Sequence, residues 1–437
     1  MFNGDYFKDM DFIKDIDFNN EFQKAFDLIE NTNDCIFITG RAGTGKSTLL
    51  KILKQKTKKN AVVLAPTGVS AINVQGQTIH SFFKFPPKII QKETPHRLRG
   101  RGAKLLKKIE LIIIDEVSMV RADLMDGIDH AMRINRGFDI PFGGAQVVMF
   151  GDLFQLPPVI RGAQLQEFFR EHYGSAYFFS ADVFKNIKLN CIELTKIYRQ
   201  SDKDFIGLLE KIRNKELLSQ DLNILNSRLI DKAMRDDVIT LTTTNELAAK
   251  MNEKHLKMLD GLEYSYQAEV SDKFEDSFFP TEFDLTLKAG AQVMLIRNDP
   301  EKRWVNGTIA QVEELGDDIV KISIGSNIYE LSKQVWSRIV YKYDGKNNTI
   351  IEEVAGTFQQ YPLRLAWAIT IHKSQGKTFD NVIIDLGWGA FAHGQVYVAL
   401  SRCSSLKGVV LKRPVRLSDI IFDQDVYKFR EKFIMTC

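Results

Sequence analysis

Residues 40–47 read Gly-Arg-Ala-Gly-Thr-Gly-Lys-Ser, a complete G-x-x-x-x-G-K-[ST] phosphate loop. An apolar, β-rich run at 35–39 precedes it, and a helix-like stretch from Ser47 to about Lys54 follows it. In this order of strand, loop and helix, the glycines let backbone N–H groups converge on phosphate oxygens at the positive end of the helix. Lys46 would reach the β- and γ-phosphates, and the Ser47 hydroxyl would complete a magnesium shell. A chance glycine-rich turn is the alternative, which the agreement of all three parts disfavours. The motif therefore predicts a nucleoside triphosphate site.

The hydrophobic pattern predicts two α/β domains. A chain of 437 residues with 44% hydrophobic content is too large for one ordinary core. Continuous apolar runs separated by helical patterns are typical of parallel strands buried on both faces. Such runs occur at 35–39, 61–65, 111–114 and 146–150, and again at 238–243, 382–386 and 408–411. Between the later runs, about 290–352 shows alternating patterns and turn signals, which favour a small antiparallel barrel inserted into the second domain.

Composition narrows the class of protein. The net charge is only +3, so a nucleic-acid surface would have to come from local clusters of basic residues. The four cysteines (Cys35, Cys191, Cys403, Cys437) are scattered without a C-x-x-C pair, which disfavours a zinc site or a disulfide scaffold. The acidic amino-terminal stretch lacks the pattern of a signal peptide, and no apolar run reaches membrane-spanning length. We expect a soluble protein without a targeting or secretion signal, cytoplasmic and nucleoid-associated if bacterial.

One basic stretch stands out in the first half. Residues 84–108 hold nine Lys or Arg against one acid, Glu93, and they separate two of the expected core strands. Charge alone is compatible with a solvated loop. The functional interpretation is a surface that touches phosphates, because clustered cations release counterions there.

A second motif supplies carboxylates. The apolar run 111–114 ends in Asp115 and Glu116, the Walker B pattern. Asp115 would hold magnesium through water, and Glu116 would polarise the attacking water. Two acids at a strand end are common by chance, but on a buried strand after a phosphate loop they favour a hydrolysing motor over a kinase, which needs a hydroxyl acceptor site instead.

Three further side chains fit such chemistry. Gln155 follows the run 146–150 and could report the state of the γ-phosphate, although a proline-terminated turn would look similar. Arg199 and Arg402 could neutralise charge on the transferred phosphoryl group, with Arg402 projecting into an interdomain cleft from a helix end. Either arginine alone could also be an ordinary surface residue.

Taken together, these motifs resemble those of superfamily-one DNA helicases of the B type, in the family named for petite integration frequency (PIF), which is related to RecD and Dda. Residues 20–25 resemble the Q motif, with Gln23 on the adenine base. Further segments resemble motifs Ia (64–68 and 76–82), II (115–119), III (151–158), V (370–376) and VI (395–402), and 123–146 resembles a signature of the family itself.

The resemblance implies an α/β fold of two RecA-like P-loop domains with parallel sheets. The first would span 1–190 with a basic insertion at about 68–108, and the second 191–437 with an SH3-like β-barrel insertion at about 255–355. It also implies an ATP-dependent 5′-to-3′ DNA helicase that uses ATP and magnesium. Such an enzyme translocates on single-stranded DNA, unwinds duplex, G-quadruplex and RNA–DNA hybrids, and serves DNA repair, recombination and telomere maintenance. The expected partners are single-stranded DNA, 5′-tailed duplex and G-quadruplex DNA, and no membrane. We expect a monomer in solution and leave a dimer on DNA open.

The same resemblance assigns roles to residues. Those expected to act in catalysis are Lys46, Glu116, Gln155, Arg199 and Arg402. Those expected to bind the nucleotide are Gln23, Gly43, Thr44, Gly45, Lys46, Ser47, Thr48 and Gly376, with Ser47 and Asp115 on magnesium. Those expected to contact DNA are Thr67, Thr78, His80, Phe82, Thr370, His372 and Lys373. Hydroxyls and amides would hold phosphates and aromatic rings would stack on bases, although Phe82 fits core packing equally well.

Three alternatives remain. A single-strand translocase that remodels nucleoprotein with little unwinding would carry the same motor residues, and only a strand-separating element near 84–108 would distinguish it. A nucleic-acid-binding scaffold with a vestigial ATPase is disfavoured by the intact set of charged motif residues. A nucleotide kinase is disfavoured because motifs in motor order continue past residue 400.

Overall fold

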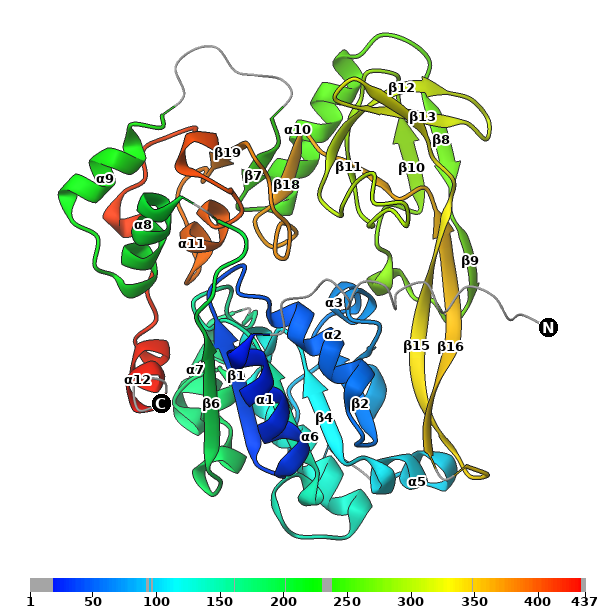
Figure 1. The fold of residues 1–437 in the computed structure, drawn as a ribbon, viewed down its shortest axis with the longest axis vertical. Helices are drawn as coiled ribbons and strands as arrows, with labels where there is room; N and C mark the ends of the chain where they lie inside the picture. The colour runs from blue at the N-terminus through cyan, green and yellow to red at the C-terminus, as the bar shows by residue number, and fades with distance from the viewer. Residues whose placement is uncertain are drawn as a thin grey trace.

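The computed structural model describes residues 19–91, 94–95, 97–160, 162–200, 202–229, 238–347 and 349–433. The acidic amino-terminal stretch, Lys92 and Glu93 of the basic stretch, and Cys437 lie outside these residues, and the expectations about them stay untested. Within the described ranges, no helix combines the length and the apolar character needed to cross a bilayer. Figure 1 shows two α/β units and an antiparallel β unit, from which a long ribbon runs beside the first α/β unit.

The first unit is built on a six-stranded parallel sheet in the order β3-β2-β4-β5-β1-β6. Its strands are β1 (Cys35–Gly40), β2 (Ala61–Ala65), β3 (Gln77–Thr78), β4 (Leu111–Ile114), β5 (Gln146–Phe150) and β6 (Leu189–Leu194). Its helices are α1 (Asn20–Asn31), α2 (Lys46–Lys56), α3 (Gly68–Asn73), α4 (Ile79–Phe83), α5 (Gly100–Lys108), α6 (Ala122–Arg136) and α7 (Ala163–Tyr173). The four apolar runs predicted as strands are confirmed, and β6 carries the sheet past residue 190.

The second unit has a four-stranded parallel sheet in the order β18-β7-β19-β20. Its strands are β7 (Thr240–Thr242), β18 (Ala368–Thr370), β19 (Val382–Asp385) and β20 (Val409–Leu411). Its helices are α8 (Lys203–Asn214), α9 (Ser219–Asn226), α10 (Asn245–Met258) and α11 (Gln395–Leu400). The last helix, α12 (Gln424–Phe433), follows this unit in the chain but packs on the first unit beside β6 (Figure 1). The three later apolar runs therefore also form parallel strands.

An antiparallel unit is inserted between β7 and β18. A five-stranded sheet in the order β14-β13-β12-β11-β17 packs beside the pair β10-β8. The strands are β8 (Tyr264–Gln267), β10 (Asp284–Leu287), β11 (Gln292–Leu295), β12 (Ile309–Leu315), β13 (Val320–Ile324), β14 (Asn327–Glu330) and β17 (Leu363–Leu365). These strands lie within 264–365 rather than 255–355, because α10 occupies the residues up to Met258. Closure into an SH3-like barrel stays a prediction.

A long ribbon of β15 (Gln334–Asp344) and β16 (Thr349–Gln360), with β9 (Glu269–Asp272) at its side, extends from this unit. It runs down the first unit as far as α5 (Figure 1). The Tyr341 hydroxyl accepts the N–H of Val63 on β2 at 2.9 Å, and the Tyr341 N–H donates to Oε1 of Gln77 on β3 at 3.2 Å. Arg338 donates to the Ser81 hydroxyl at 3.0 Å. The ribbon thereby covers β3, which would otherwise expose the edge of the first sheet.

The basic stretch 84–108 packs on the first unit and does not form a separate subdomain. The N–H of Ile90 donates to Asp123 at 2.8 Å and the N–H of Leu98 donates to Asn135 at 2.7 Å, both on α6. Its last part forms α5, which lies against α6 and the ribbon. A strand-separating role for this stretch stays a prediction.

Candidate active site at the edge of the first sheet

Four neighbouring strands of the first sheet bring the expected nucleotide residues together. The order β4-β5-β1-β6 places Asp115 and Glu116, the loop 151–158, the phosphate loop 40–47 and the loop 195–202 at the carboxyl ends of adjacent strands. Parallel strands end at one edge of a sheet, and ligands of open α/β sheets bind in the crevice there. Sequence motifs that lie far apart along the chain therefore meet at one site.

The phosphate loop has the geometry of an anion cradle. Gly43 and Gly45 have φ values of +84° and +86°, which strain any residue with a Cβ. Lys46, the first residue of α2, donates to the carbonyl oxygens of Gly40 at 2.6 Å and Arg41 at 2.9 Å. Burial lowers the pKa of the Lys46 ammonium. The negative charges of Asp152 and Glu116 act in the opposite direction and raise this pKa. Phosphate oxygens would give this buried ammonium stronger partners than carbonyl groups.

The loop 195–202 is packed directly on the phosphate loop. The N–H of Tyr198 donates to the carbonyl of Gly43 at 2.9 Å, and a Cβ added at Gly43 would lie 2.4 Å from Cβ of Arg199. Arg199 reaches the carbonyl of Gly376 in the second unit at 3.4 Å, while among the described residues its buried Nη1 has no hydrogen-bond partner. This buried N–H can serve an anion in the loop.

The two carboxylates after β4 are costly to ionise. Burial raises the pKa of Asp115 to about 7, with a further contribution from Glu116. Burial likewise raises the pKa of Glu116, whose backbone takes a left-handed conformation with φ 49°. A buried carboxylate pair of this kind favours a divalent cation, and carboxylate and hydroxyl oxygens are ligands that Mg²⁺ accepts. The exposed Ser47 on the neighbouring loop supplies such a hydroxyl, so these residues fit magnesium.

Gln155 connects the first unit to the second. Its amide donates to Asp152 Oδ2 at 3.1 Å, and its carbonyl oxygen accepts from Nε2 of Gln375 at 3.4 Å. The backbone around it also touches the second unit, because a Cβ added at Gly394 would lie 2.6 Å from the Gln155 carbonyl oxygen. A change at a γ-phosphate beside Gln155 can therefore reach the second unit through one hydrogen bond.

Arg402 faces the same region but is folded into its own unit. It is 1% exposed, and it donates to the Val398 carbonyl at 3.0 Å and the Ser401 hydroxyl at 2.9 Å. In this conformation the N–H groups of Arg402 are held within the second unit, and its expected role on the transferred phosphoryl group stays a prediction. Burial, together with the charge of Arg199, lowers the pKa of Arg402 to about 9. The neighbouring Tyr397, which sequence reasoning did not single out, accepts the N–H of Ala42 in the phosphate loop at 3.3 Å.

The remaining nucleotide residues divide into two groups. Thr44 is buried in the loop, where its hydroxyl donates to the Arg41 carbonyl at 3.0 Å, and Thr48 lies half-buried on α2. Gln23 is exposed on α1 and donates to Asp27 at 2.7 Å, so the structure does not bring it to the loop. The neighbouring residue, Phe22, lies closer to the phosphate loop than Gln23 does. A Cβ added at Gly45 would lie 2.8 Å from Cζ of the Phe22 ring.

The threonines expected to contact DNA cap short helices and turns. Thr67 accepts the N–H of Ser70 at 3.2 Å, Thr78 that of Ser81 at 3.3 Å, and Thr370 that of Lys373 at 3.2 Å. At a capped helix N-terminus, the remaining backbone N–H groups point away from the helix. These groups can donate hydrogen bonds to phosphate oxygens. Beside Thr67, α3 is covered by the antiparallel unit, because a Cβ at Gly68 would lie 2.7 Å from the Ser277 carbonyl.

The other residues expected to contact DNA differ in how far they are exposed to solvent. Phe82 is 6% exposed, and its ring packs against Phe83 and Tyr341 at centroid distances of 4.9 and 6.1 Å. The core-packing interpretation is therefore the correct one in this conformation. Lys373 is exposed, His80 and His372 are half-buried, and burial lowers the pKa of all three.

Sequence reasoning also missed Arg213, which lies on α8 beside Asp152. Phe205, Leu208, Leu209 and Ile212 form the buried stripe of that helix, and Arg213 continues it at helical spacing. An arginine in an apolar stripe is unusual, so the amphipathic pattern itself was the available signal.

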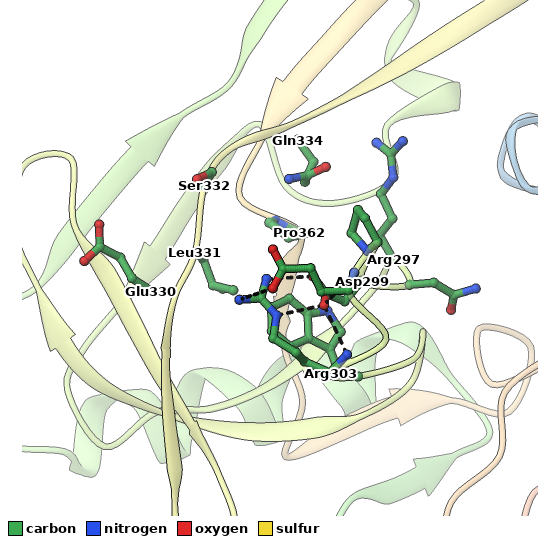
Figure 2. Close-up of a pocket in the computed structure, with 12 residues that line it drawn as sticks. Arg297, Asp299, Arg303, Glu330, Leu331, Ser332, Gln334 and Pro362 are labelled. Carbon is green, nitrogen blue, oxygen red and sulfur yellow. Dashed lines mark hydrogen bonds and ion pairs between the residues drawn. The ribbon is translucent and has the colours of Figure 1, made fainter. Parts of the chain in front are cut away.

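A separate cavity of about 170 Å³ lies in the antiparallel unit, and Figure 2 shows its lining. Two of its charged residues are paired with each other: Arg303 donates to both oxygens of Asp299 at 2.8 Å, and its guanidinium carbon lies 4.7 Å from the ring centroid of Trp304. It shares no lining residue with the edge of the first sheet. We therefore place the candidate active site at the phosphate loop.

Comparisons with known proteins agree with this geometry. Residues 17–222 match the PIF1-like helicase family, and residues 365–410 match the UvrD-like helicase C-terminal domain. The ATP-dependent DNA helicase Pif1 of Bdellovibrio bacteriovorus is 30% identical over 96% of this chain and 93% of that protein. The mouse (Mus musculus) ATP-dependent DNA helicase PIF1 is 35% identical over 86% of this chain, which spans 57% of the mouse protein.

Solved structures show the same likeness. Pif1 from Bacteroides sp in complex with ADP-AlF4 superimposes with a TM-score of 0.90 at 38% identity, covering 97% of this chain and 98% of that chain. Bacteroides Pif1 bound to ssDNA superimposes with a TM-score of 0.70 at 39% identity, with the same coverage of 97% and 98%. The two α/β units with their insertion thus form a known architecture.

Proposed function

This chain belongs to the PIF1-like helicase family, and we propose that it is an ATP-dependent DNA helicase that moves along single-stranded DNA and unwinds duplex. The observation that carries the proposal is the nucleotide site completed across two units: the loops after four neighbouring strands of the first sheet meet Gln375, Gly376 and Tyr397 of the second. Binding and hydrolysis at such a boundary change how the units fit together, which is what a motor requires.

We assign the chemistry as follows. Lys46 and the N–H groups of the phosphate loop hold the β- and γ-phosphates, and Ser47 and Asp115 hold magnesium, which neutralises charge on the phosphates when bound. Glu116 orients and deprotonates the attacking water, and Gln155 contacts the γ-phosphate or that water. Arg199 and Arg402 stabilise charge in the transition state, after Arg402 exchanges its contacts within the second unit for the phosphate.

We further propose 5′-to-3′ movement, with tailed duplex, G-quadruplex and RNA–DNA hybrids as substrates. Thr67, Thr78, His80, Thr370, His372 and Lys373 are the candidate contacts to the DNA backbone. Support for DNA as the partner comes from Bacteroides Pif1, which has been solved bound to ssDNA, and from a similar structure that concerns DNA unwinding at forked dsDNA by two coordinating Pif1 helicases. The fork complex supports a second copy of this chain on forked DNA as part of the proposal.

ATP hydrolysis measured with and without single-stranded DNA tests the proposal. We expect single-stranded DNA to raise the rate of ATP turnover at least ~10-fold. The reason is that DNA would favour the arrangement of the two units in which the second unit completes the nucleotide site. Turnover that ignores DNA would contradict the motor assignment. Stimulation without any unwinding would instead identify a single-strand translocase.

A further inference from the structure

A phenylalanine of the first unit is inserted into the second. Phe154 lies in the loop after β5, is 2% exposed, and packs among residues that follow residue 200. The guanidinium carbon of Arg213 lies 4.3 Å from its ring centroid, and that of Arg430 on α12 lies 5.6 Å away. The rings of His393 and Phe422 lie at 6.3 and 6.4 Å. Phe154 therefore fixes where the loop that carries Gln155 meets the second unit.

Arg213 is only partly paired despite its burial. It is 4% exposed, and Nη1 lies 3.3 Å from Glu193 Oε1 on β6. Among the described residues, its Nε and Nη2 have no hydrogen-bond partner, and Nη2 stops 3.8 Å from Asp152 Oδ1. A buried donor without a partner costs free energy that a small movement could recover.

Asp152 is the point at which Arg213 can influence the site. Its Oδ1 accepts the N–H of Phe154 at 3.1 Å, and its Oδ2 accepts the side-chain amide of Gln155 at 3.1 Å. The orientation of Gln155 thus depends on where the Asp152 carboxylate lies. A charge-assisted N–H···O contact spans about 2.7–2.9 Å, so an approach of about 1 Å would join Arg213 to Asp152.

We propose that Arg213 is a positioning residue that couples the place of the second unit to ATP hydrolysis by pairing with Asp152 and thereby orienting Gln155. The inference rests on the proposed function, because it concerns the arrangement in which the two units close on ATP. In this structure the two side chains form an ion pair at 3.8 Å, which shortens to a hydrogen bond in the hydrolysing arrangement. Phe154 guides the approach, and Arg213 contributes the charge.

Variants at Arg213 and Arg430 separate this role from simple packing. Both arginines lie over the Phe154 ring, but Arg430 donates to Asn214 at 2.8 Å and has no acid partner among the described residues. We expect R213Q to lower the DNA-stimulated kcat at least ~10-fold while the Kd for ATP and for single-stranded DNA change less than ~2-fold. R430Q should keep the wild-type kcat. R213K, which keeps the charge, should recover part of the loss and covers the case in which R213Q does not fold.

The outcomes are distinct. Wild-type kcat in R213Q, an equal loss in R430Q, or a loss confined to thermal stability would overturn the inference. A double-mutant cycle with D152N sharpens the test: the two losses should not add, because both variants remove the same pair. Additive losses would also overturn it. If the wild-type protein itself shows no DNA-stimulated hydrolysis, the proposed function fails, whatever the variants do.

Discussion

At the scale of single residues, the site concentrates buried groups of both charges. Lys46, Arg199 and Arg402 meet Asp115 and Glu116 where the two units touch, and burial shifts the pKa of each of the five groups against its charged form. A triphosphate with magnesium would supply both signs of charge that these groups lack. The same groups therefore give the most direct residue-level tests.

Replacing Glu116 by Gln should separate binding from hydrolysis. An amide keeps the size and shape of the side chain but cannot serve as a general base, so we expect the Kd for ATP to stay within ~3-fold and kcat to fall by at least ~100-fold. Rapid-mixing turnover and nucleotide titration measure the two quantities. K46A is the control that should lose both. Turnover near the wild-type rate in E116Q would remove Glu116 from the mechanism.

Lys377 gives a prediction about pH. Its ammonium donates to Asn306 of the antiparallel unit at 2.5 Å, and burial together with the charge of Arg364 lowers its pKa from 10.5 to about 7. Below pH 7 the folded protein bears the full cost of burying the charge. Between pH 7 and 10.5 only the unfolded state keeps the proton, so the cost shrinks as pH rises.

K377M should therefore raise the thermal midpoint more at pH 6 than at pH 9.5, where the charged form is already lost from the folded protein. Thermal unfolding at one scan rate and both pH values measures the difference. K346M, at an exposed turn of the ribbon, is the control and should show no such pH dependence. A gain for K377M that is independent of pH would contradict a buried, titrating Lys377.

The sequence predicted the positions of several site residues because their motifs are local. Asp115 and Glu116 follow β4, and Lys46 begins α2 after the phosphate loop. Arg213 and Tyr397 were missed because their partners, Asp152 and Ala42, lie in the other unit. The sequence left the role of Phe82 open, because a ring beside a motif expected to contact DNA has the same pattern whether it stacks on a base or, as in this structure, packs against Tyr341.

At the scale of elements, strands with long apolar runs were predictable and others were not. Strand β6 alternates buried and half-exposed residues, and β3 has only two residues, so neither has a continuous run. The residues of β15 and β16 were predicted as part of a barrel. The alternation of apolar and polar residues does not reveal whether a strand closes a barrel or extends away from it. The docking of this ribbon on the first unit is a tertiary contact without a local signal.

Y341F tests that docking. The Tyr341 hydroxyl is the partner of the buried Val63 N–H, so its loss should lower the free energy of unfolding by about 1–3 kcal/mol. Denaturant titration measures this change. Y264F is the matched control, because the structure records no hydrogen bond for the Tyr264 hydroxyl within the described part of the chain. Equal stability of Y341F and the wild-type protein would show that the hydroxyl does not hold the ribbon in place.

At the scale of the whole molecule, the arrangement of the units is more similar to some solved relatives than to others. The chain superimposes better on Bacteroides Pif1 with ADP-AlF4 than on Bacteroides Pif1 bound to ssDNA, although sequence identity is nearly the same. In this arrangement the antiparallel unit covers α3 next to Thr67. If Thr67 contacts DNA as proposed, we expect the DNA to displace that unit.

We expect single-stranded DNA to move the antiparallel unit relative to the first sheet. Dyes at the exposed positions Lys24 and Asn327 should show a change in energy-transfer efficiency when single-stranded DNA is added. A second pair at Lys24 and Lys107, both in the first unit, should not change. An unchanged signal from the first pair at saturating DNA would mean that DNA binds without this movement.

The most direct test of the central claim is unwinding of duplexes that carry a single-stranded tail at either the 5′ or the 3′ end, with ATP and magnesium, for the wild-type protein and E116Q side by side. An ATP-driven helicase with the proposed direction separates the 5′-tailed duplex, leaves the 3′-tailed duplex intact, and loses this activity in E116Q. Unwinding from the 3′ tail would contradict the direction. Strand separation that persists in E116Q or without ATP would contradict the motor itself.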